Sequence, residues 1–150
     1  MFQLLSPGVE PQTLMLQNII GKSEWTILYF YPKDNTPGCT AEAIEFTALA
    51  PEFKKMKTQI VWVSQDSIAS HCNFMEKNTL KINLLSDPDK KLHKIYWARW
   101  EKNMYGKKTE WTIRSTFILN QDMEVIHSRK NVRAKGHAEK VFARVSTNLK

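Results

Sequence analysis

Short runs of apolar residues mark the predicted β-strands of this chain. The runs Thr26–Tyr31, Gln59–Ser64 and Ser115–Leu119 are rich in β-branched, aromatic and leucine side chains. Short runs of this kind, bounded by polar or turn-forming residues, are typical of buried strands. A short extended segment is expected at Leu84–Leu85. Met123–His127 follows an Asn-Gln-Asp turn, which predicts a β-hairpin with the strand before it.

Between the first two strands the apolar positions change to a helical spacing. A helix is predicted from about Cys39, because apolar residues then recur three and four positions apart. Pro51 falls inside this pattern and is expected to kink or restart the helix, since proline lacks a backbone donor and clashes with the preceding turn. The apolar positions of this helix are Phe46, Leu49, Phe53 and Met56.

Three further helices are predicted by the same spacing. One lies near residues 67–78, one starts at Asp87, and the last is amphipathic and runs from about His137 to Leu149. The residues of the middle helix that are expected to face inward are Leu92, Ile95 and Tyr96.

The order of these elements indicates the fold class. Two extended segments, Phe2–Leu5 and Gln12–Leu16, precede two strand-helix-strand runs, a hairpin and a terminal helix. This order predicts an α/β layered domain with a central mixed β-sheet flanked by helices, and it matches a thioredoxin-like fold. With 150 residues, 42% of them hydrophobic, the chain is expected to form a single domain over residues 1–150, and we find no repeat or linker.

The apolar runs and the number of cysteines indicate the compartment in which the protein is expected. The longest apolar run is far shorter than a membrane span, and residues 1–11 lack the basic and apolar regions of a signal peptide. Two cysteines, Cys39 and Cys72, are too few for a disulfide-stapled secreted scaffold. We therefore expect a cytoplasmic protein whose thiols are reactive rather than structural, with no membrane association.

The chain is basic, with a formal net charge of +7. Such a charge favours acidic partners in general, but no zinc-finger, RRM or other nucleic-acid module accompanies it. Nucleic acid is therefore not an expected partner, and the basic residues are expected to form a solvated surface. The main basic clusters are Lys102, Lys107 and Lys108, and Arg129, Lys130, Arg133 and Lys135.

Cys39 lies in the connection between a predicted strand and the predicted helix that follows it. Thr36, Pro37 and Gly38 lead directly into Cys39. Only a thiolate attacks efficiently, and the free N–H groups and dipole of a helix start stabilise negative charge at such a position. This placement predicts a reactive thiolate; the alternative from the residues alone is a buried, inert cysteine in a proline-rich turn.

The segment YFYPKDNTPGCTAEAIEF, which begins at Tyr29, resembles the active-site signature of the peroxiredoxins. The resemblance is closest to the branch of the bacterioferritin comigratory protein, also called peroxiredoxin Q, and it extends over most of the chain from about Gly21. It implies a thiol peroxidase that reduces hydrogen peroxide and organic hydroperoxides without a cofactor or metal. The branch is commonly monomeric, which implies a monomer here.

The resemblance also assigns roles to four residues. Cys39 matches the peroxidatic cysteine, Thr36 the residue whose hydroxyl bonds the peroxide and the sulfur, and Pro32 the shield of the site. Arg114 matches the arginine of the family's Arg-Ser-Thr-Phe segment. Its guanidinium would hold the thiolate and bind the charge that develops on the leaving oxygen.

The resolving thiol follows the pattern of the branch less closely. Many relatives carry it five residues after the peroxidatic cysteine, but that position here is Ile44. Some relatives resolve from the following helix, where Cys72 lies, and the resulting disulfide would be reduced by thioredoxin or another thiol reductant. The alternative is a structural Cys72 in the stripe of Ile68 and Met75, which would leave a one-cysteine enzyme reduced directly by an external thiol.

Several other functions find little support. The four histidines are dispersed and give neither metal-ligand spacing nor an identifiable hydrolase motif, and Glu42 stands where a Cys-x-x-Cys motif needs its second cysteine. A non-enzymatic basic binding or redox-sensing module is the remaining alternative. The aromatic stretch is expected to pack in the core rather than bind lipid hydroperoxides or a partner; its residues are Tyr96, Trp97, Trp100, Tyr105 and Trp111.

Overall fold

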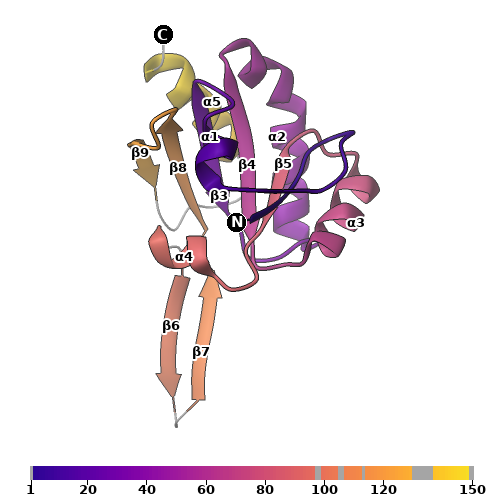
Figure 1. Ribbon diagram of the computed structural model, residues 1–150, viewed down its shortest axis with the longest axis vertical. Helices are drawn as coiled ribbons and strands as arrows, with labels where there is room; N and C mark the ends of the chain where they lie inside the picture. The colour runs from indigo at the N-terminus through magenta and orange to yellow at the C-terminus, as the bar shows by residue number, and fades with distance from the viewer. Residues whose placement is uncertain (1, 97–98, 105–106, 113, 130–136, 149–150) are drawn as a thin grey trace.

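A seven-stranded mixed sheet forms the centre of the computed structural model, which describes residues 2–96, 99–104, 107–112, 114–129 and 137–148 (Figure 1). The strand order is β2-β1-β5-β4-β3-β8-β9. Within it, β3 pairs in parallel with β4 and antiparallel with β8, and β4 pairs in parallel with β5. The strands are β1 (Phe2–Leu5), β2 (Gln12–Leu14), β3 (Trp25–Phe30), β4 (Thr58–Ser64), β5 (Asn83–Ser86), β8 (Ser115–Asn120) and β9 (Val125–Arg129).

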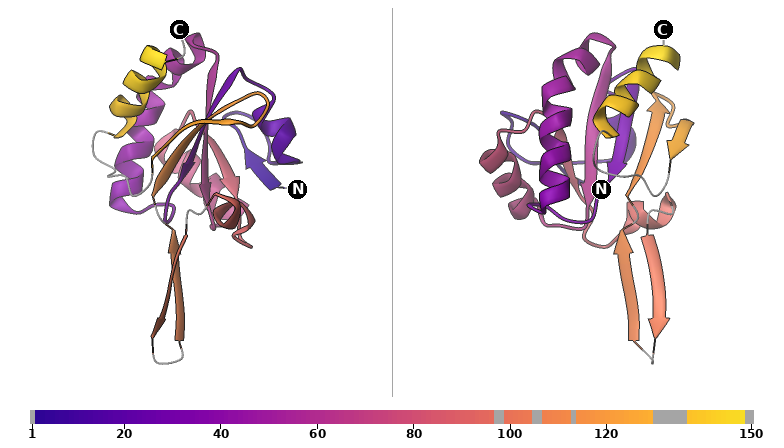
Figure 2. Two further views of the ribbon diagram at one scale, coloured as in Figure 1. Left: turned by 90° about the vertical axis from the view of Figure 1, so that its left-hand side faces the viewer. Right: turned by 180° about the vertical axis from the view of Figure 1, so that it is seen from behind.

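Helices cover both faces of this sheet, as predicted for the fold class (Figure 2). One face packs against the long helix α2 (Pro37–Lys55), α3 (Ile68–Asn78) and α5 (His137–Asn148). The other face packs against the short helices α1 (Leu16–Ile20) and α4 (Lys91–Ile95). Among the described helices, none is long and apolar enough to cross a membrane.

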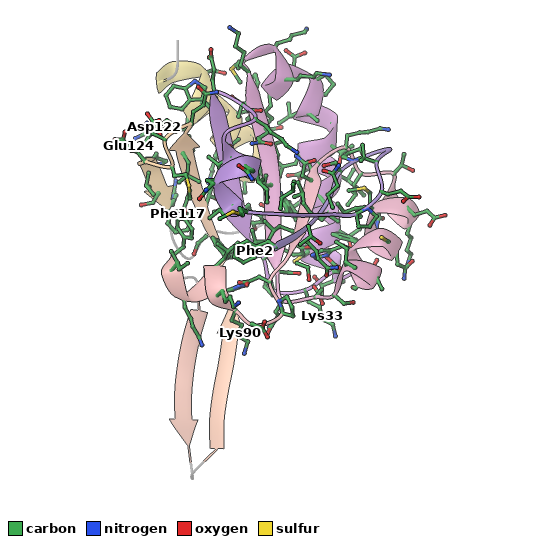
Figure 3. The ribbon with its side chains drawn as sticks, viewed as in Figure 1. Phe2, Lys33, Lys90, Phe117, Asp122 and Glu124 are labelled. Carbon is green, nitrogen blue, oxygen red and sulfur yellow. The ribbon has the colours of Figure 1, made fainter. Side chains whose placement is uncertain are left out.

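The two-residue period of the strands divides the core into these two layers. In β3, Ile27 and Tyr29 point to the α2 side, whereas Leu28 and Phe30 point to the α4 side. All four side chains are fully buried. In Figure 3 the side chains drawn as sticks fill the space on both sides of the ribbon of the sheet, and Phe117 of β8 belongs to the α4 layer.

A second, two-stranded sheet extends away from the main body (Figures 1 and 2). It consists of β6 (Arg99–Met104) and β7 (Lys107–Thr112), which pair antiparallel with Trp100 opposite Trp111. The sequence did not predict this hairpin. The predicted packing of the aromatic stretch is not tested, because Trp97 and Tyr105 lie outside the described residues, as do the side chains of Trp100 and Trp111. Other residues named above that lie outside them are Lys130, Arg133, Lys135 and Leu149.

Pro51 does not restart the helix that contains it. α2 is assigned as one helix from Pro37 to Lys55 with Pro51 inside it, so the predicted restart is wrong. An interior proline costs about 3 kcal/mol. Phe46 and Phe53, on either side of Pro51, are fully buried and stack with ring centroids 6.2 Å apart. Burial of two such side chains contributes about 1.5–3 kcal/mol each, which offsets the cost of the proline.

Three smaller predictions also differ from the structure. The second N-terminal segment is extended only to Leu14, because Leu16 already begins α1. The helix expected from Asp87 begins at Lys91. Of its residues expected to face inward, Leu92 is buried but Ile95 is 64% exposed, since a helix of only five residues presents a narrow face to the sheet.

Candidate active site

Cys39 lies at the start of α2, where the chain turns from β3 into the helix. Thr36 is the N-cap residue with extended backbone, and Pro37 occupies the first helical position, where its missing N–H costs nothing. The first helical hydrogen bond runs from the Thr40 amide to the Thr36 carbonyl at 2.8 Å. Cys39 therefore lies in the first turn, with its sulfur buried and its thiol free.

The sheet register brings Arg114 to the same edge of the sheet as Cys39. Phe30, the last residue of β3, pairs with Ser115, the first residue of the antiparallel strand β8. The loop that leaves β3 and the residue that precedes β8 therefore meet at one end of the sheet. Lys33, which is labelled in Figure 3, belongs to this loop.

The Arg114 guanidinium joins three groups of the site. Nη2 donates to Cys39 Sγ at 3.3 Å. Nη1 lies 3.0 Å from Tyr29 Oη and 3.1 Å from Glu42 Oε2, and it donates to both. The Arg114 side chain is 18% exposed, whereas that of Glu42 is fully buried. Because two neighbours hold Nη1 of this guanidinium, the N–H groups of Nη2 stay available for an anionic sulfur.

Tyr29 and Glu42 complete the network behind the arginine. Tyr29 Oη donates to Glu42 Oε2 at 2.7 Å. Burial, followed by the Glu42 charge, raises the pKa of Tyr29 well above its ordinary value, so the phenol stays protonated and acts as a donor. Burial also raises the pKa of Glu42 to about 7, although the Tyr29 hydrogen bond and the Arg114 charge oppose the shift.

The two remaining loop residues of the predicted site behave differently from Arg114. The Thr36 hydroxyl donates to the Lys33 carbonyl at 3.0 Å, and no hydrogen bond joins it to Cys39 among the described residues. Pro32 is half-buried at the start of the same loop. The structure thus brings Cys39 and Arg114 into contact, while Thr36 is engaged with the backbone of its own loop.

Cys72 is not bonded to Cys39. Both thiols are free, and Cys72 is half-buried on α3, packed against the core cluster that contains Cys39. It also lines a surface groove beside the turn between β1 and β2, with Leu5 and Val9. The structure therefore places the predicted resolving thiol in the same layer of the molecule, but in a different local environment.

Sequence reasoning gave no role in the site to Tyr29 or Glu42. Glu42 follows Cys39 by three positions, which places both on one face of a helix, and Ala43 and Phe46 continue that buried face. A glutamate within an otherwise buried stripe was the available signal. Tyr29 could have been found from its period-two relation to Ile27, which places it on the α2 side of β3.

In the part of the chain that the structure describes, no group of three or more His, Cys, Asp or Glu side chains is placed to hold a metal ion.

The sequence of this chain is similar to those of known proteins of one family. The model of the AhpC/TSA family matches residues 2–128. The chain is 44% identical to peroxiredoxin Bcp of Xanthomonas campestris over 126 residues, which cover 84% of this chain and 79% of that protein. It is 46% identical to a putative peroxiredoxin of Helicobacter pylori over 137 residues, which cover 91% of this chain and 87% of that protein.

Solved structures agree with these relatives. The bacterioferritin comigratory protein of Xanthomonas campestris superposes with a TM-score of 0.86 and 39% identity, covering 99% of this chain and 91% of that one. BcpB of Mycobacterium tuberculosis superposes with a TM-score of 0.80 and 27% identity, covering 98% and 92% of the two chains. These neighbours have a thioredoxin-like fold, so the predicted fold class is confirmed.

Proposed function

Because the chain belongs to the AhpC/TSA family, in the peroxiredoxin branch of the bacterioferritin comigratory protein and peroxiredoxin Q, we propose that Cys39 is the peroxidatic residue of a thiol peroxidase. The proposed substrates are hydrogen peroxide and small organic hydroperoxides. The observation that carries the proposal is the contact between Arg114 Nη2 and Cys39 Sγ at 3.3 Å, since a buried thiolate needs a cation at that distance.

The first step is a displacement at oxygen. The Cys39 thiolate attacks the terminal oxygen of the peroxide, an S–O bond forms and the O–O bond breaks. The sulfur is oxidised by two electrons to the sulfenic acid, and the peroxide is reduced to an alcohol or water once its leaving oxygen takes a proton. Charge moves from sulfur to the leaving oxygen, so Arg114 stabilises the negative charge at both ends of the step.

Thr36 and Pro32 act on the substrate side in this proposal. The Thr36 hydroxyl, now bound to the Lys33 carbonyl at 3.0 Å, would turn toward the peroxide and hydrogen-bond it beside the sulfur. Pro32 would shield the site from water, which strengthens the interaction between the thiolate and the arginine. Both roles follow from the match to the family motif.

Tyr29 and Glu42 are positioning residues. Neither accepts a hydrogen bond from the sulfur, but both hold Arg114 Nη1, which leaves Nη2 for Cys39. The guanidinium plane is rigid, so fixing one edge fixes the other.

Recycling is proposed to pass through Cys72. Its thiolate would attack the Cys39 sulfenic acid, form a disulfide and release water, and thioredoxin would then reduce the disulfide by thiol exchange. Cys72 is half-buried rather than fully enclosed in the core, which supports this role. The alternative is a one-cysteine enzyme in which an external thiol reduces Cys39 directly.

Two further proposals follow from the branch. The Xanthomonas campestris relative is described in terms of its alkyl peroxide reduction activity, which supports organic hydroperoxides as substrates here. We also propose that residues 1–150 act as one peroxidase domain in a monomer. Antioxidant defence in the cytoplasm would be the setting of such an enzyme.

The experiment that tests the proposal measures the rate at which the reduced protein consumes hydrogen peroxide. Cys39→Ser is expected to abolish consumption, since the nucleophile is lost. Arg114→Gln is expected to slow the reaction by about 10- to 100-fold, which corresponds to the loss of one or two charge-assisted hydrogen bonds. Lys77→Gln removes the same charge from an exposed position of α3 and serves as the control.

Three results would contradict the proposal. Full peroxide consumption by the Cys39→Ser protein would exclude Cys39 as the nucleophile. An equal loss in the Arg114→Gln and Lys77→Gln proteins would mean that only net charge matters. Absence of turnover in the unmodified protein, together with salt-sensitive retention on nucleic acid, would instead favour the basic binding module.

A further inference from the structure

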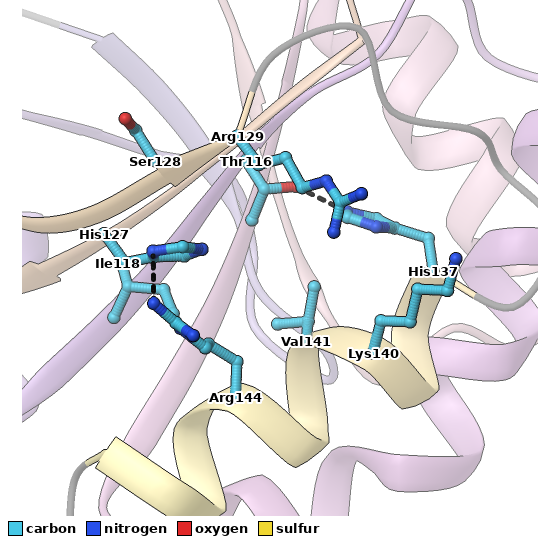
Figure 4. A pocket seen from close by; sticks show the side chains of 9 residues that line it. All are labelled: Thr116, Ile118, His127, Ser128, Arg129, His137, Lys140, Val141 and Arg144. Carbon is cyan, nitrogen blue, oxygen red and sulfur yellow. Dashed lines mark hydrogen bonds between the residues drawn. The ribbon is translucent and has the colours of Figure 1, made fainter.

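A cavity that the proposed reaction does not use lies between the β8–β9 hairpin and α5 (Figure 4). Its volume is about 360 Å³, which falls within the range of small-molecule sites. Nine residues line it: Thr116, Ile118, His127, Ser128, Arg129, His137, Lys140, Val141 and Arg144.

Positive charge dominates this cavity. Arg129 comes from β9, and Lys140 and Arg144 come from successive turns of α5. Among the described residues, no acidic side chain lines the cavity, and no carboxylate forms an ion pair with any of these three cations. Three like charges around one space repel one another, and a bound anion would relieve this repulsion.

The two arginines reach the cavity from different elements, Arg129 from β9 and Arg144 from α5. Arg144 Nη2 donates to His127 Nδ1 at 3.3 Å, which orients one guanidinium from the α5 side of the cavity. In Figure 4, Arg129 extends toward His137, so that a guanidinium from each wall borders the cavity. Guanidinium groups bind the oxygens of phosphate in pairs, and a lysine adds a further point charge.

Burial, and after it the neighbouring cations, lower the pKa of both histidines that line the cavity. Burial, followed by the charges of Arg129, Arg114 and Lys140, lowers the pKa of His137 to about 4. Burial and the charges of Arg144 and Arg129 lower the pKa of His127 in the same direction. Both rings are therefore neutral at pH 7, and the positive charge comes from the arginines and the lysine.

We propose that this cavity binds a phosphate monoester, with Arg129, Lys140 and Arg144 around the phosphate and Ile118 and Val141 against an apolar part of the ligand. A dianion matches three cations better than a single carboxylate does. The phosphate could belong to a soluble metabolite or to a lipid headgroup. Neither Cys39 nor Cys72 takes part, so the inference does not depend on the proposed peroxidase reaction.

The test uses inorganic phosphate and phenyl phosphate as probes. Binding is followed at constant ionic strength, with sodium chloride as the reference salt, through the NMR signals of the His137 imidazole and through the thermal midpoint. We expect saturable binding that shifts the His137 signals and raises the midpoint. Phenyl phosphate is expected to bind more tightly than phosphate, because Ile118 and Val141 would contact its ring.

A pair of double variants identifies the site. Arg129→Gln with Arg144→Gln is expected to weaken binding by roughly 100-fold, about tenfold for each guanidinium removed. Lys22→Gln with Lys77→Gln removes two charges from exposed positions elsewhere and is expected to bind as the unmodified protein does. Far-UV circular dichroism of both double variants checks that the fold is retained.

Two outcomes would overturn the inference. One is a response that sodium chloride reproduces at equal ionic strength, and the other is equal weakening in both double variants. Vesicles of phosphatidylcholine with and without phosphatidic acid separate the two sources of phosphate. Cosedimentation that needs phosphatidic acid and is lost with Arg129→Gln and Arg144→Gln assigns the lipid headgroup, and binding of phenyl phosphate alone assigns a soluble ligand.

Discussion

At the scale of single residues, Arg114 serves two acidic groups at once. Its guanidinium contacts the Cys39 sulfur at 3.3 Å and the Glu42 carboxyl at 3.1 Å. When Glu42 is charged, the carboxylate neutralises part of the field that would stabilise the Cys39 thiolate. When Glu42 is protonated, more of that field acts on the sulfur. The charge state of Glu42 is therefore expected to influence both the stability of the protein and the reactivity of Cys39.

The variant Glu42→Gln tests this coupling through stability. Because burial raises the pKa of Glu42 to about 7, the folded protein binds more protons than the unfolded chain between pH 4.5 and 7. The stabilisation that the protonated Glu42 side chain gives to the folded state is thus complete below pH 4.5 and is lost as pH rises through 7. We expect the unmodified protein to lose on the order of 3 kcal/mol relative to the Glu42→Gln protein over this range.

Urea unfolding of both proteins from pH 4.5 to 8 measures this difference. The two proteins must be compared at each pH because His137 changes stability in the opposite direction. The pKa of His137 is lowered to about 4. The stability that its neutral imidazole contributes is therefore present above its ordinary pKa and is lost as pH falls through 4. Glu52→Gln, on the exposed side of the same helix, is the control. A pH-independent difference for Glu42→Gln would contradict the shift.

The residues that sequence analysis found and those it missed differ in a physical way. Cys39 and Arg114 were predicted because a motif names both. The burial of Tyr29 and Glu42 could be inferred from the periods of β3 and α2, but their contact with Arg114 could not. Arg114 lies 85 positions after Tyr29 and 72 positions after Glu42 in the sequence, and no local pattern encodes a contact over such a separation.

At the scale of elements, a buried contact ties the loop before α2 to the first turns of α3. Asp34 Oδ2 accepts from the Ser70 hydroxyl at 2.8 Å and lies 2.7 Å from His71 Nδ1. The other ring nitrogen of His71 lies 3.0 Å from the Leu85 carbonyl. Each ring nitrogen of His71 therefore contacts an oxygen atom of a different element, one in the loop before α2 and one in β5.

Breaking this pair is expected to be costly. His71 and Asp34 have side-chain exposures of 0% and 1%, so His71→Leu would leave a buried carboxyl group without its imidazole partner. Loss of one partner of a buried hydrogen bond costs about 1–3 kcal/mol, and more when the group left behind is charged. We expect a loss of this size in the free energy of unfolding, measured with urea at pH 7.

Two further variants make this result interpretable. Asn73→Leu places the same side chain at an exposed position of α3 and is expected to change stability by less than about 0.5 kcal/mol. Asp34→Asn combined with His71→Leu removes the carboxyl group together with its imidazole partner and is expected to recover part of the loss. A loss below about 1 kcal/mol for His71→Leu alone would contradict a stabilising contact between the two buried side chains.

The predicted bounds of strands were most accurate where the apolar residues follow one clear pattern. β3, β4 and β8 were expected within one residue because their apolar runs are continuous. The β6–β7 hairpin was not expected, since Arg99–Met104 and Lys107–Thr112 mix aromatic and charged residues without a clear period. Of the two predicted effects of Pro51, the restart did not occur, because local propensity yields to tertiary packing, here the burial of Phe53 beyond it; a kink stays a prediction.

At the scale of the whole molecule, Cys39 and Cys72 lie in the same helical layer, but in different local environments. Both pack in the layer formed by α2, α3 and α5. The Cys39 sulfur faces Arg114, while Cys72 lines the groove beside Leu5 and Val9. A disulfide needs the two sulfur atoms within bonding distance and the Cα atoms within about 7 Å. We expect conversion to the disulfide to withdraw Cys39 from Arg114 and to open the first turns of α2 and α3.

Oxidation with one equivalent of hydrogen peroxide tests this movement. If Cys72 resolves, mass spectrometry will find a Cys39–Cys72 disulfide, and hydrogen exchange will become faster over residues 37–43 and 68–74, because first-turn bonds such as Thr40 N–H to Thr36 carbonyl are lost. The later part of α2 should keep its protection, since Phe46 and Phe53 remain packed. The Cys72→Ser protein, oxidised in the same way, should keep slow exchange in both segments. Oxidation of Cys39 alone in the unmodified protein would exclude Cys72 as the resolving thiol and leave a one-cysteine enzyme.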